Sequence, residues 1–388
     1  MKKRKTARVC TCVLLALLLV GFLINLPLAI PPFSEFLAGR RTLSELSREV
    51  HAAYVDAFSF KASWIDLNGA YARMTGRRVC HGVSLLKNGM LDRDGLAPID
   101  TSVIADGIVR LSDALAEQGI GVLYVQIPSK LDLEGTLACD GIENAALKNA
   151  DALCTALSLH GVPVLDLRPL LCASVEDVES NFYRTDHHWS TDGAFCAFGT
   201  LLERISRMLP TGAVNTALAD ASRWERTVYP SWMLGSHGKR VGRFFGGVDD
   251  LVLYTPRQSV ETALSVPHKG TVRTGVFADV LLCSEYLDAP NYFEDDAYCV
   301  YLGGNYPLTL HETPSAAGGA HVLLVKDSFS LPLESMLSTS ISRLDAIDPR
   351  YYREETVLSY AERTRPDLVV VAINPSVFSD ASYWNYGA

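Results

Sequence analysis

The sequence has no basic stripe outside its N-terminus and no cysteine pair at the Cys-x-x-Cys spacing typical of structural zinc sites. Its 388 residues include 35 basic and 44 acidic ones, a formal net charge of −9. Nucleic acid is therefore not an expected partner. No internal repeat or low-complexity segment stands out, which argues against solenoid and fibrous architectures. What remains is an ordinary globular composition, 48% hydrophobic, in a chain long enough to bury a sizeable core.

The N-terminus carries the one cluster of positive charge, followed by an apolar stretch at 9–30. As a helix, such a stretch is about long enough to cross the ~30 Å hydrocarbon core of a bilayer. Basic residues at its amino end predict a cytoplasmic N-terminus and an extracytoplasmic main domain, on a single-pass protein of the cell membrane. A cleaved signal peptide fits the same pattern, but the run exceeds the ~7–15 residues usual for one. The basic residues are Lys2, Lys3, Arg4, Lys5 and Arg8.

Three regions follow from the distribution of apolar residues and turn signals. Residues 1–31 are expected to form the cytoplasmic tail and membrane anchor, 32–101 a helical stalk and entry segment, and 102–388 the main domain. In that domain, short apolar strands alternate with helical segments, which predicts an α/β/α sandwich around a parallel central sheet. A β-rich insertion is expected at about 215–315. The predicted strands cover 122–127, 162–165, 322–325, 344–347 and 368–373.

Two short motifs carry the candidate chemistry. Asp186 stands two residues before His188, and on an extended segment both side chains would share one face, where the carboxylate can accept the ring N–H. Ser328 follows the strand at 322–325 and so should lie at the carboxyl end of the sheet, where ligands bind in such folds. A hydroxyl, a base and a group that orients the base are the parts of a serine nucleophile. Asn374, which ends the last strand, could donate a hydrogen bond to an oxyanion.

Simpler interpretations remain for the same residues. A serine after a strand is commonly the N-cap of the next helix, and an Asp-x-His pair is commonly a buried hydrogen-bonded pair. Asp186, His187 and His188 could also hold zinc together with a distant fourth ligand. Adjacent residues of an extended chain point to opposite faces, however, which argues against a shared ion. We therefore expect neither a metal nor a cofactor.

Four motifs in combination resemble the bacterial DHHW protein family, which is similar to the SGNH-hydrolase-like domain of the alginate O-acetyltransferases AlgX and AlgJ. The resemblance runs from about residue 55 to the end, and implies an SGNH-hydrolase-like fold for the main domain. It implies Ser328 as nucleophile, His188 as base, Asp186 as its orienter and Arg350 as a substrate-side contact. Lys326 stands where ordinary SGNH enzymes have glycine, and is a further candidate contact to substrate or oxyanion. The motifs are 184–189, 302–307, 326–329 and 347–351.

The resemblance implies an O-acyl (acetyl) transferase or esterase that acts on a cell-surface polysaccharide through an acyl-serine intermediate. By the same analogy, an integral-membrane O-acyltransferase would deliver the acyl group. The alternative is a catalytically inactive SGNH-fold protein that binds glycans or assists polysaccharide assembly. Aromatic residues of the predicted insertion, among them Trp224, Tyr229 and Trp232, would suit sugar stacking in that case, or be core.

Overall fold

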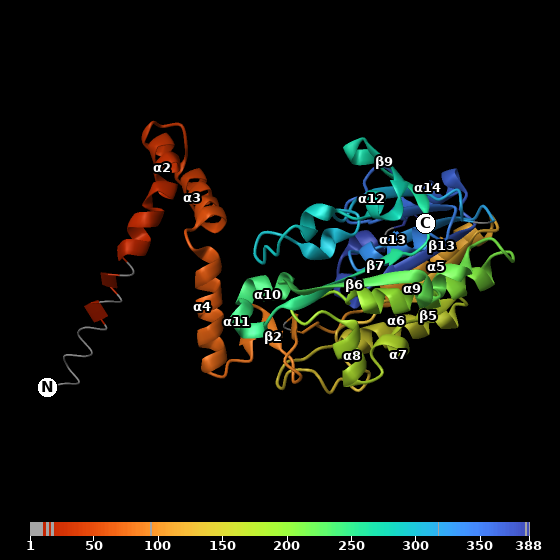
Figure 1. The fold of residues 1–388 in the computed structure, drawn as a ribbon, viewed down its shortest axis with the longest axis horizontal. Coiled ribbons are helices and arrows are strands. Elements are labelled where there is room, and N and C mark those ends of the chain that lie inside the picture. Colours follow the sequence, from red (N-terminus) through yellow and green to blue (C-terminus); the bar gives the residue numbers. More distant parts are fainter. Residues whose placement is uncertain are drawn as a thin grey trace. The chain divides into compact units, whose positions relative to one another are not determined.

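The computed structural model describes residues 11–12, 15–16, 19–93, 95–316, 318–384 and 386–387. The chain divides into two compact units, Met1–Asn68 and Gly69–Ala388. The first is helical and is drawn in red and orange in Figure 1. A capping box, in which Thr42 and Glu45 bond each other's backbone N–H groups, starts its helix α3. Its helices are η1 (Leu26–Ala29), α2 (Ile30–Leu37), α3 (Leu43–Ala57) and the first part of α4 (Lys61–Met74).

One helical segment, Leu19–Leu37, is long and apolar enough to cross a membrane, and it lies near the N-terminus. A signal sequence passes the same test of length and composition, so this segment is a candidate anchor or signal. It overlaps the expected span at 9–30 and extends beyond it. The basic residues Lys2 to Arg8, on which the predicted orientation depends, lie outside the described residues.

A central sheet of eight strands organises the second unit, in the order β5-β4-β13-β11-β12-β10-β8-β9. The first five strands are parallel, and β10, β8 and β9 continue the sheet antiparallel. The predicted α/β fold with a large, mostly parallel sheet is therefore confirmed. The strands are β4 (Gly121–Gln126), β5 (Val164–Asp166), β8 (Glu261–Val266), β9 (Thr271–Val276), β10 (Leu308–Glu312), β11 (His321–Lys326), β12 (Arg343–Ile347) and β13 (Leu368–Ile373).

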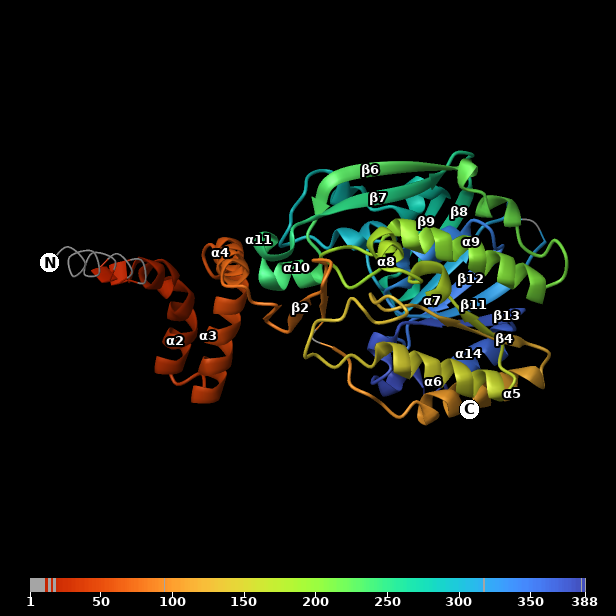
Figure 2. The same ribbon diagram turned by 90° about the horizontal axis from the view of Figure 1, so that it is seen from below.

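Helices cover both faces of this sheet, because its parallel strands are apolar on both sides. Leu123 and Val125 of β4 pack with the core on one face, and Val122 and Tyr124 with the core on the other. Figure 2 shows α5, α6 and α14 on one side of the strands and α9 on the other. The covering helices are α5 (Ser102–Ala116), α6 (Ala146–Leu159) and α14 (Val357–Thr364) on the first face, and α9 (Thr191–Met208) and α13 (Ser330–Ser338) on the second.

The segment at 215–315 is rich in strands, as expected, but it divides between two sheets. Strands β6 (Trp224–Met233) and β7 (Asp249–Pro256) form a separate pair beside α9, where Phe195 stacks on Tyr254. Strands β8, β9 and β10 instead extend the central sheet. A small sheet of β1 (Val79–Cys80), β2 (Val83–Leu85) and β3 (Leu91–Arg93) precedes the main one. Short helices α7 (Arg168–Leu171), α8 (Val175–Asn181), α10 (Ser236–Val241), α11 (Arg243–Gly246) and α12 (Phe277–Leu281) fill the connections.

Candidate active site

The carboxyl ends of the parallel strands gather polar residues at one edge of the sheet. Ser328 follows β11 and is half-buried, and Asn374 follows the neighbouring strand β13. Lys130 comes four residues after β4, which pairs with β13 on its other side. This is the edge at which open α/β sheets bind ligands.

The run from Arg184 to Trp189 is a series of bends between α8 and α9, not the extended segment that the sequence suggested. A single bridge between Phe182 and Trp189 closes the loop. Within it, Oδ1 of Asp186 accepts hydrogen bonds from the backbone N–H of His188 (2.9 Å) and from ring atom Nδ1 of the same residue (2.6 Å). An Asx-type turn therefore brings the carboxylate to the imidazole, and strand alternation does not.

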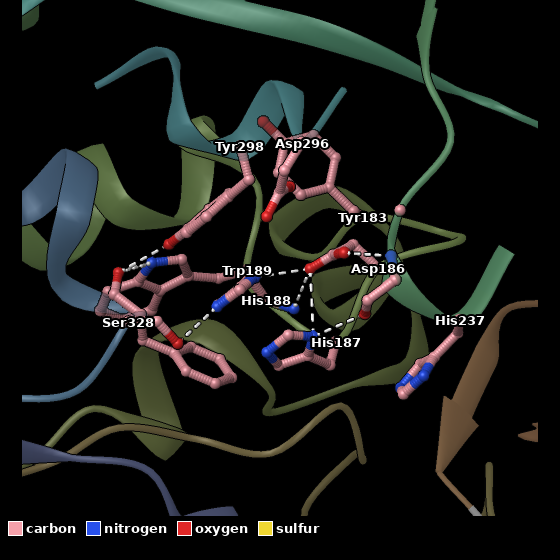
Figure 3. Close-up of polar contacts among 12 residues, drawn as sticks. Tyr183, Asp186, His187, His188, Trp189, His237, Asp296, Tyr298 and Ser328 are labelled. Atoms are coloured by element: carbon pink, nitrogen blue, oxygen red, sulfur yellow. Dashed lines mark hydrogen bonds and ion pairs between the residues drawn. The ribbon is translucent and has the colours of Figure 1, made fainter. Parts of the chain in front are cut away.

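The other ring nitrogen of His188 reaches the serine. Atom Nε2 lies 2.9 Å from Oγ of Ser328, so that Asp186, His188 and Ser328 form one hydrogen-bonded line (Figure 3). Because Nδ1 faces a carboxylate, it carries the ring proton, which leaves the lone pair of Nε2 directed at the serine hydroxyl. In this arrangement the imidazole can take a proton from Ser328.

The carboxyl group of Asp186 is held in its charged form. Burial alone would raise its pKa, but His187, His188 and the backbone N–H of Ser236 hold the pKa well below its usual value. The bond from Ser236 to Oδ2 is 2.6 Å long. A fixed anion at this place stabilises the imidazolium that forms when His188 accepts a proton.

Aromatic residues fix the ring and the serine loop. Tyr298 stacks face to face on His188, with ring centroids 3.8 Å apart and an angle of 4° between the planes. Its hydroxyl group and Nε1 of Trp189 both donate to the carbonyl oxygen of Phe329, at 2.7 and 2.8 Å. The residue after the serine is thus tied to the residue after the histidine. The sequence gave no signal for Tyr298, which lies in the short 3-10 helix η6 (Ala297–Val300), far from both motifs in the chain.

Asp327 anchors the serine loop to the next strand. Its two carboxylate oxygens accept from the backbone N–H groups of Phe329 (2.9 Å) and Asn374 (2.8 Å). Burial raises the pKa of Asp327 to about 6, against the lowering effect of the bond from Asn374. The side chain of Asn374 donates to the carbonyl oxygen of Pro128 at 2.7 Å, which joins the ends of β13 and β4. One hydrogen of its amide group remains for another acceptor.

Lys326 is placed in the core, where it cannot act as the substrate or oxyanion contact that the sequence suggested. Only 1% of its side chain is exposed, and Nζ bonds Oδ1 of Asn305 (2.6 Å) and pairs with Glu334 (3.2 Å). The side chain follows β11 inward because the residue is still part of that buried strand.

Asn305 links Lys326 to Asp348, which in turn binds Arg350. Its amide donates to Asp348 at 2.5 Å, and Asp348 holds the Arg350 guanidinium through two bonds of 3.1 and 2.7 Å. Arg350 lines the pocket described next, and its role as a substrate-side contact stays a prediction. A line of partly buried polar contacts thus joins Lys326 to Arg350.

A pocket of about 280 Å³ lies at this edge of the sheet. His187 and Phe329, the immediate neighbours of the base and the serine, are part of its wall. Four cationic side chains and one carboxylate also line it, from four different parts of the fold: Asp92 and Arg93 of β3, Lys130, Arg240 and Arg350. Asn374, Ser376 and Val377 line it on the β13 side.

His187 turns toward the same side as His188 rather than away from it. The two ring centroids are 3.7 Å apart, and Nδ1 of His187 lies 2.7 Å from Oγ of Ser236. Burial and the neighbouring His188 lower the pKa of His187 to about 4. Ligand atoms of Asp186, His187 and His188 lie within 4.8 Å of one another, so the argument from opposite faces does not hold. However, both ring nitrogens of His188 already have hydrogen-bond partners, Nδ1 in Asp186 and Nε2 in Ser328.

Comparisons with known proteins agree with the fold. Residues 97–227 match the family model described as the SGNH hydrolase-like domain of the acetyltransferase AlgX; this segment includes Asp186 and His188 and ends before Ser328. A comparison with curated proteins gave no match. The structure of Bacillus cereus PatB1 with a sulfonyl adduct is 20% identical, covers 78% of this chain and 96% of that one, and has a TM-score of 0.63. A DHHW family protein from Eubacterium siraeum is 17% identical, with coverage of 77% and 96% and a TM-score of 0.54.

These matches confirm the predicted resemblance: the second unit carries an SGNH-hydrolase-like fold, and proteins of the DHHW family share it. At identities of 20% and below, the two structures establish the fold, and the activity has to be inferred from the residues of the site.

Proposed function

We propose that this protein is a membrane-anchored, extracytoplasmic O-acyl (acetyl) transferase or esterase that acts on a cell-surface polysaccharide through an acyl-serine intermediate. The observation that carries the proposal is the hydrogen-bonded line from Asp186 through His188 to Ser328, at the edge of a pocket. Ser328 is the nucleophile, His188 the general base and Asp186 the residue that orients it. The polysaccharide and a membrane O-acyltransferase partner are implied by the resemblance to AlgX and AlgJ.

In the first half of the reaction, Ser328 Oγ attacks the carbonyl carbon of an acyl ester while its proton passes to Nε2 of His188. The alcohol of the donor leaves with that proton. The backbone N–H of Ser328 has no hydrogen-bond acceptor within the described part of the chain, and the Asn374 amide has a hydrogen to spare. Both are available to the negative charge that develops on the carbonyl oxygen, where losing one donor typically costs ~10²–10³ in rate.

In the second half, the hydroxyl of a sugar, or water, attacks the acyl carbon and gives its proton to His188, which returns it to Ser328. Transfer and hydrolysis differ only in that second nucleophile. Arg350 is proposed to contact the substrate, because it lines the pocket and Asp348 is its only ion-pair partner among the described residues.

Turnover of a soluble acetyl ester tests this proposal. The parent should release acetate, and Ser328→Ala should release none above background. Ser180→Ala, which removes an exposed hydroxyl on α8, is the matched control and should behave as the parent does. Unchanged turnover in Ser328→Ala would refute the serine assignment. If the parent neither turned over the ester nor became labelled at Ser328 by a sulfonyl fluoride, the glycan-binding alternative would be favoured.

A further inference from the structure

His237 is a buried histidine in the wall of the pocket. It lies on α10, only 9% of its side chain is exposed, and it lines the pocket. Neither ring nitrogen has a hydrogen-bond partner among the residues that the structure describes. A buried polar group left unpaired is costly, so native proteins nearly always satisfy such groups with protein, water or ligand.

A buried carboxylate accompanies this histidine. Oδ1 of Asp92, on β3, lies 3.8 Å from Nε2 of His237, too far for a hydrogen bond but close enough for one small group to touch both. Asp92 also lines the pocket. Burial raises the pKa of Asp92 and lowers that of His237 to about 2, so the imidazole is neutral at ordinary pH. A neutral imidazole offers one donor and one acceptor, which matches a hydroxyl group.

The pair lies beside the catalytic line but outside it. The ring of His237 is 5.8 Å from that of His187, which is itself 3.7 Å from the ring of His188 (Figure 3). Asp186, His188 and Ser328 are satisfied without any bond to His237 or Asp92. Whatever His237 and Asp92 bind therefore sits next to the acyl group without taking part in forming it.

We propose that His237 and Asp92 form the acceptor subsite, which binds hydroxyl groups of a sugar while another hydroxyl of the same sugar attacks the acyl-serine. This inference rests on the proposed function. In the step concerned, the acceptor oxygen forms the new ester bond to the acyl carbon, and the bond from that carbon to Ser328 Oγ breaks. The acceptor proton goes to His188 and then to Ser328 Oγ. His237 and Asp92 hold the sugar by its other hydroxyls and so favour it over water.

The experiment separates acylation from transfer in the full-length protein. With 4-nitrophenyl acetate alone, the release of 4-nitrophenol by His237→Leu and Asp92→Asn gives the acylation activity of each variant, against which its transfer activity is compared. With acceptors added, transfer of acetyl to sugar, followed by mass spectrometry, should fall roughly tenfold or more, because hydrogen bonds to the acceptor are lost. The acceptor panel is cellopentaose and methyl glycosides of neutral, amino and uronic sugars. His160→Leu, at the exposed end of α6, is the matched control.

Stability gives a second readout. If His237 awaits a ligand, His237→Leu removes an unpaired buried group, and its Tm without sugar should equal or exceed that of the parent. The acceptor subsite would be overturned if His237→Leu had a Tm several degrees lower than the parent. It would also be overturned if acylation and transfer fell equally, or if transfer were unchanged in both variants. A parent that acetylates no sugar of the panel would overturn it as well. A parent that neither releases 4-nitrophenol nor becomes labelled at Ser328 would instead refute the proposed function.

Discussion

The Nε2 atom of His188 lies 2.9 Å from Oγ of Ser328, although the two residues are 140 positions apart in the chain. Two loops at the same edge of the sheet make this contact, and Phe329 joins them, since its carbonyl oxygen accepts from both Trp189 and Tyr298. Hydrogen bonds of their neighbours thus support the direct contact between the base and the hydroxyl.

Asp186→Asn tests the role of the orienting carboxylate. An amide can present its N–H to His188 and favour the wrong tautomer, with the proton on Nε2. By comparison with the serine-protease triad, turnover should fall by ~10⁴-fold while the fold persists. Steady-state kinetics together with circular dichroism check both parts. Turnover within tenfold of the parent would show that Asp186 does not set the tautomer.

Tyr298→Phe and Trp189→Phe test the tie between the two loops. Each variant leaves Phe329 with one donor, so Tyr298→Phe should cost roughly 1 kcal/mol of stability. Trp189→Phe should cost more, because Trp189 is fully buried and the smaller ring leaves a cavity. The double variant leaves a buried carbonyl unpaired, and its loss should exceed the sum of the single losses. Urea unfolding of the parent and the three variants gives the coupling free energy between the two donors. Ester turnover should fall in the same order as stability. Strict additivity would mean that the two donors act independently.

The buried ion pair of Lys326 and Glu334 predicts a larger loss of stability when one charge is removed than when both are. Lys326→Met leaves the Glu334 carboxylate without its cation and should cost ~3–5 kcal/mol of stability. The double variant Lys326→Met with Glu334→Gln removes both charges, keeps an acceptor for Thr309 and His311, and should recover a large part of that loss. Thermal unfolding compares the two. If the double variant were less stable than Lys326→Met, the pair would not be the reason for the first loss.

Glu334 also predicts a pH dependence of stability. Burial would raise its pKa, but Lys326, His311 and Thr309 lower it to about 2 from an ordinary value of 4.5. Because the folded-state pKa is the lower one, the carboxylate contributes stability above about pH 4.5, and that contribution is lost as pH falls toward 2. The Tm measured from pH 6 to pH 2 should fall, and Glu334→Gln should flatten the fall. An equal slope in both proteins would exclude Glu334 as a source.

The parallel part of the fold could be predicted from sequence because its strands are buried on both faces and read as apolar runs. The runs at 322–325 and 368–373 appear as β11 and β13, nearly to the residue. Strands β8 and β9 were not predicted as part of the central sheet. Their exposed positions, such as Glu261 and Val272, interrupt the apolar pattern, and their pairing is set by tertiary contact.

Some residues of the candidate site could be predicted from the sequence and others could not. Asp186, His188 and Ser328 stand in motifs, and strand ends predict where they meet. Nothing local marks His237, Asp92 or Tyr298, because their significance depends on packing from separate elements. The geometry of Asp186 with His188 was predicted for the wrong reason, since the loop bends where the sequence suggested an extended segment. The predicted domain boundaries at 31 and 101 stay predictions.

Intact-mass analysis after treatment with a sulfonyl fluoride tests the central claim most directly, because such reagents react with an activated serine. The parent should gain the mass of one sulfonyl group, located at Ser328 by peptide mapping, and Ser328→Ala should gain none. Asp186→Asn should be labelled far more slowly than the parent. A parent that stays unlabelled, or a Ser328→Ala protein labelled as fully as the parent, would contradict an activated serine at this position.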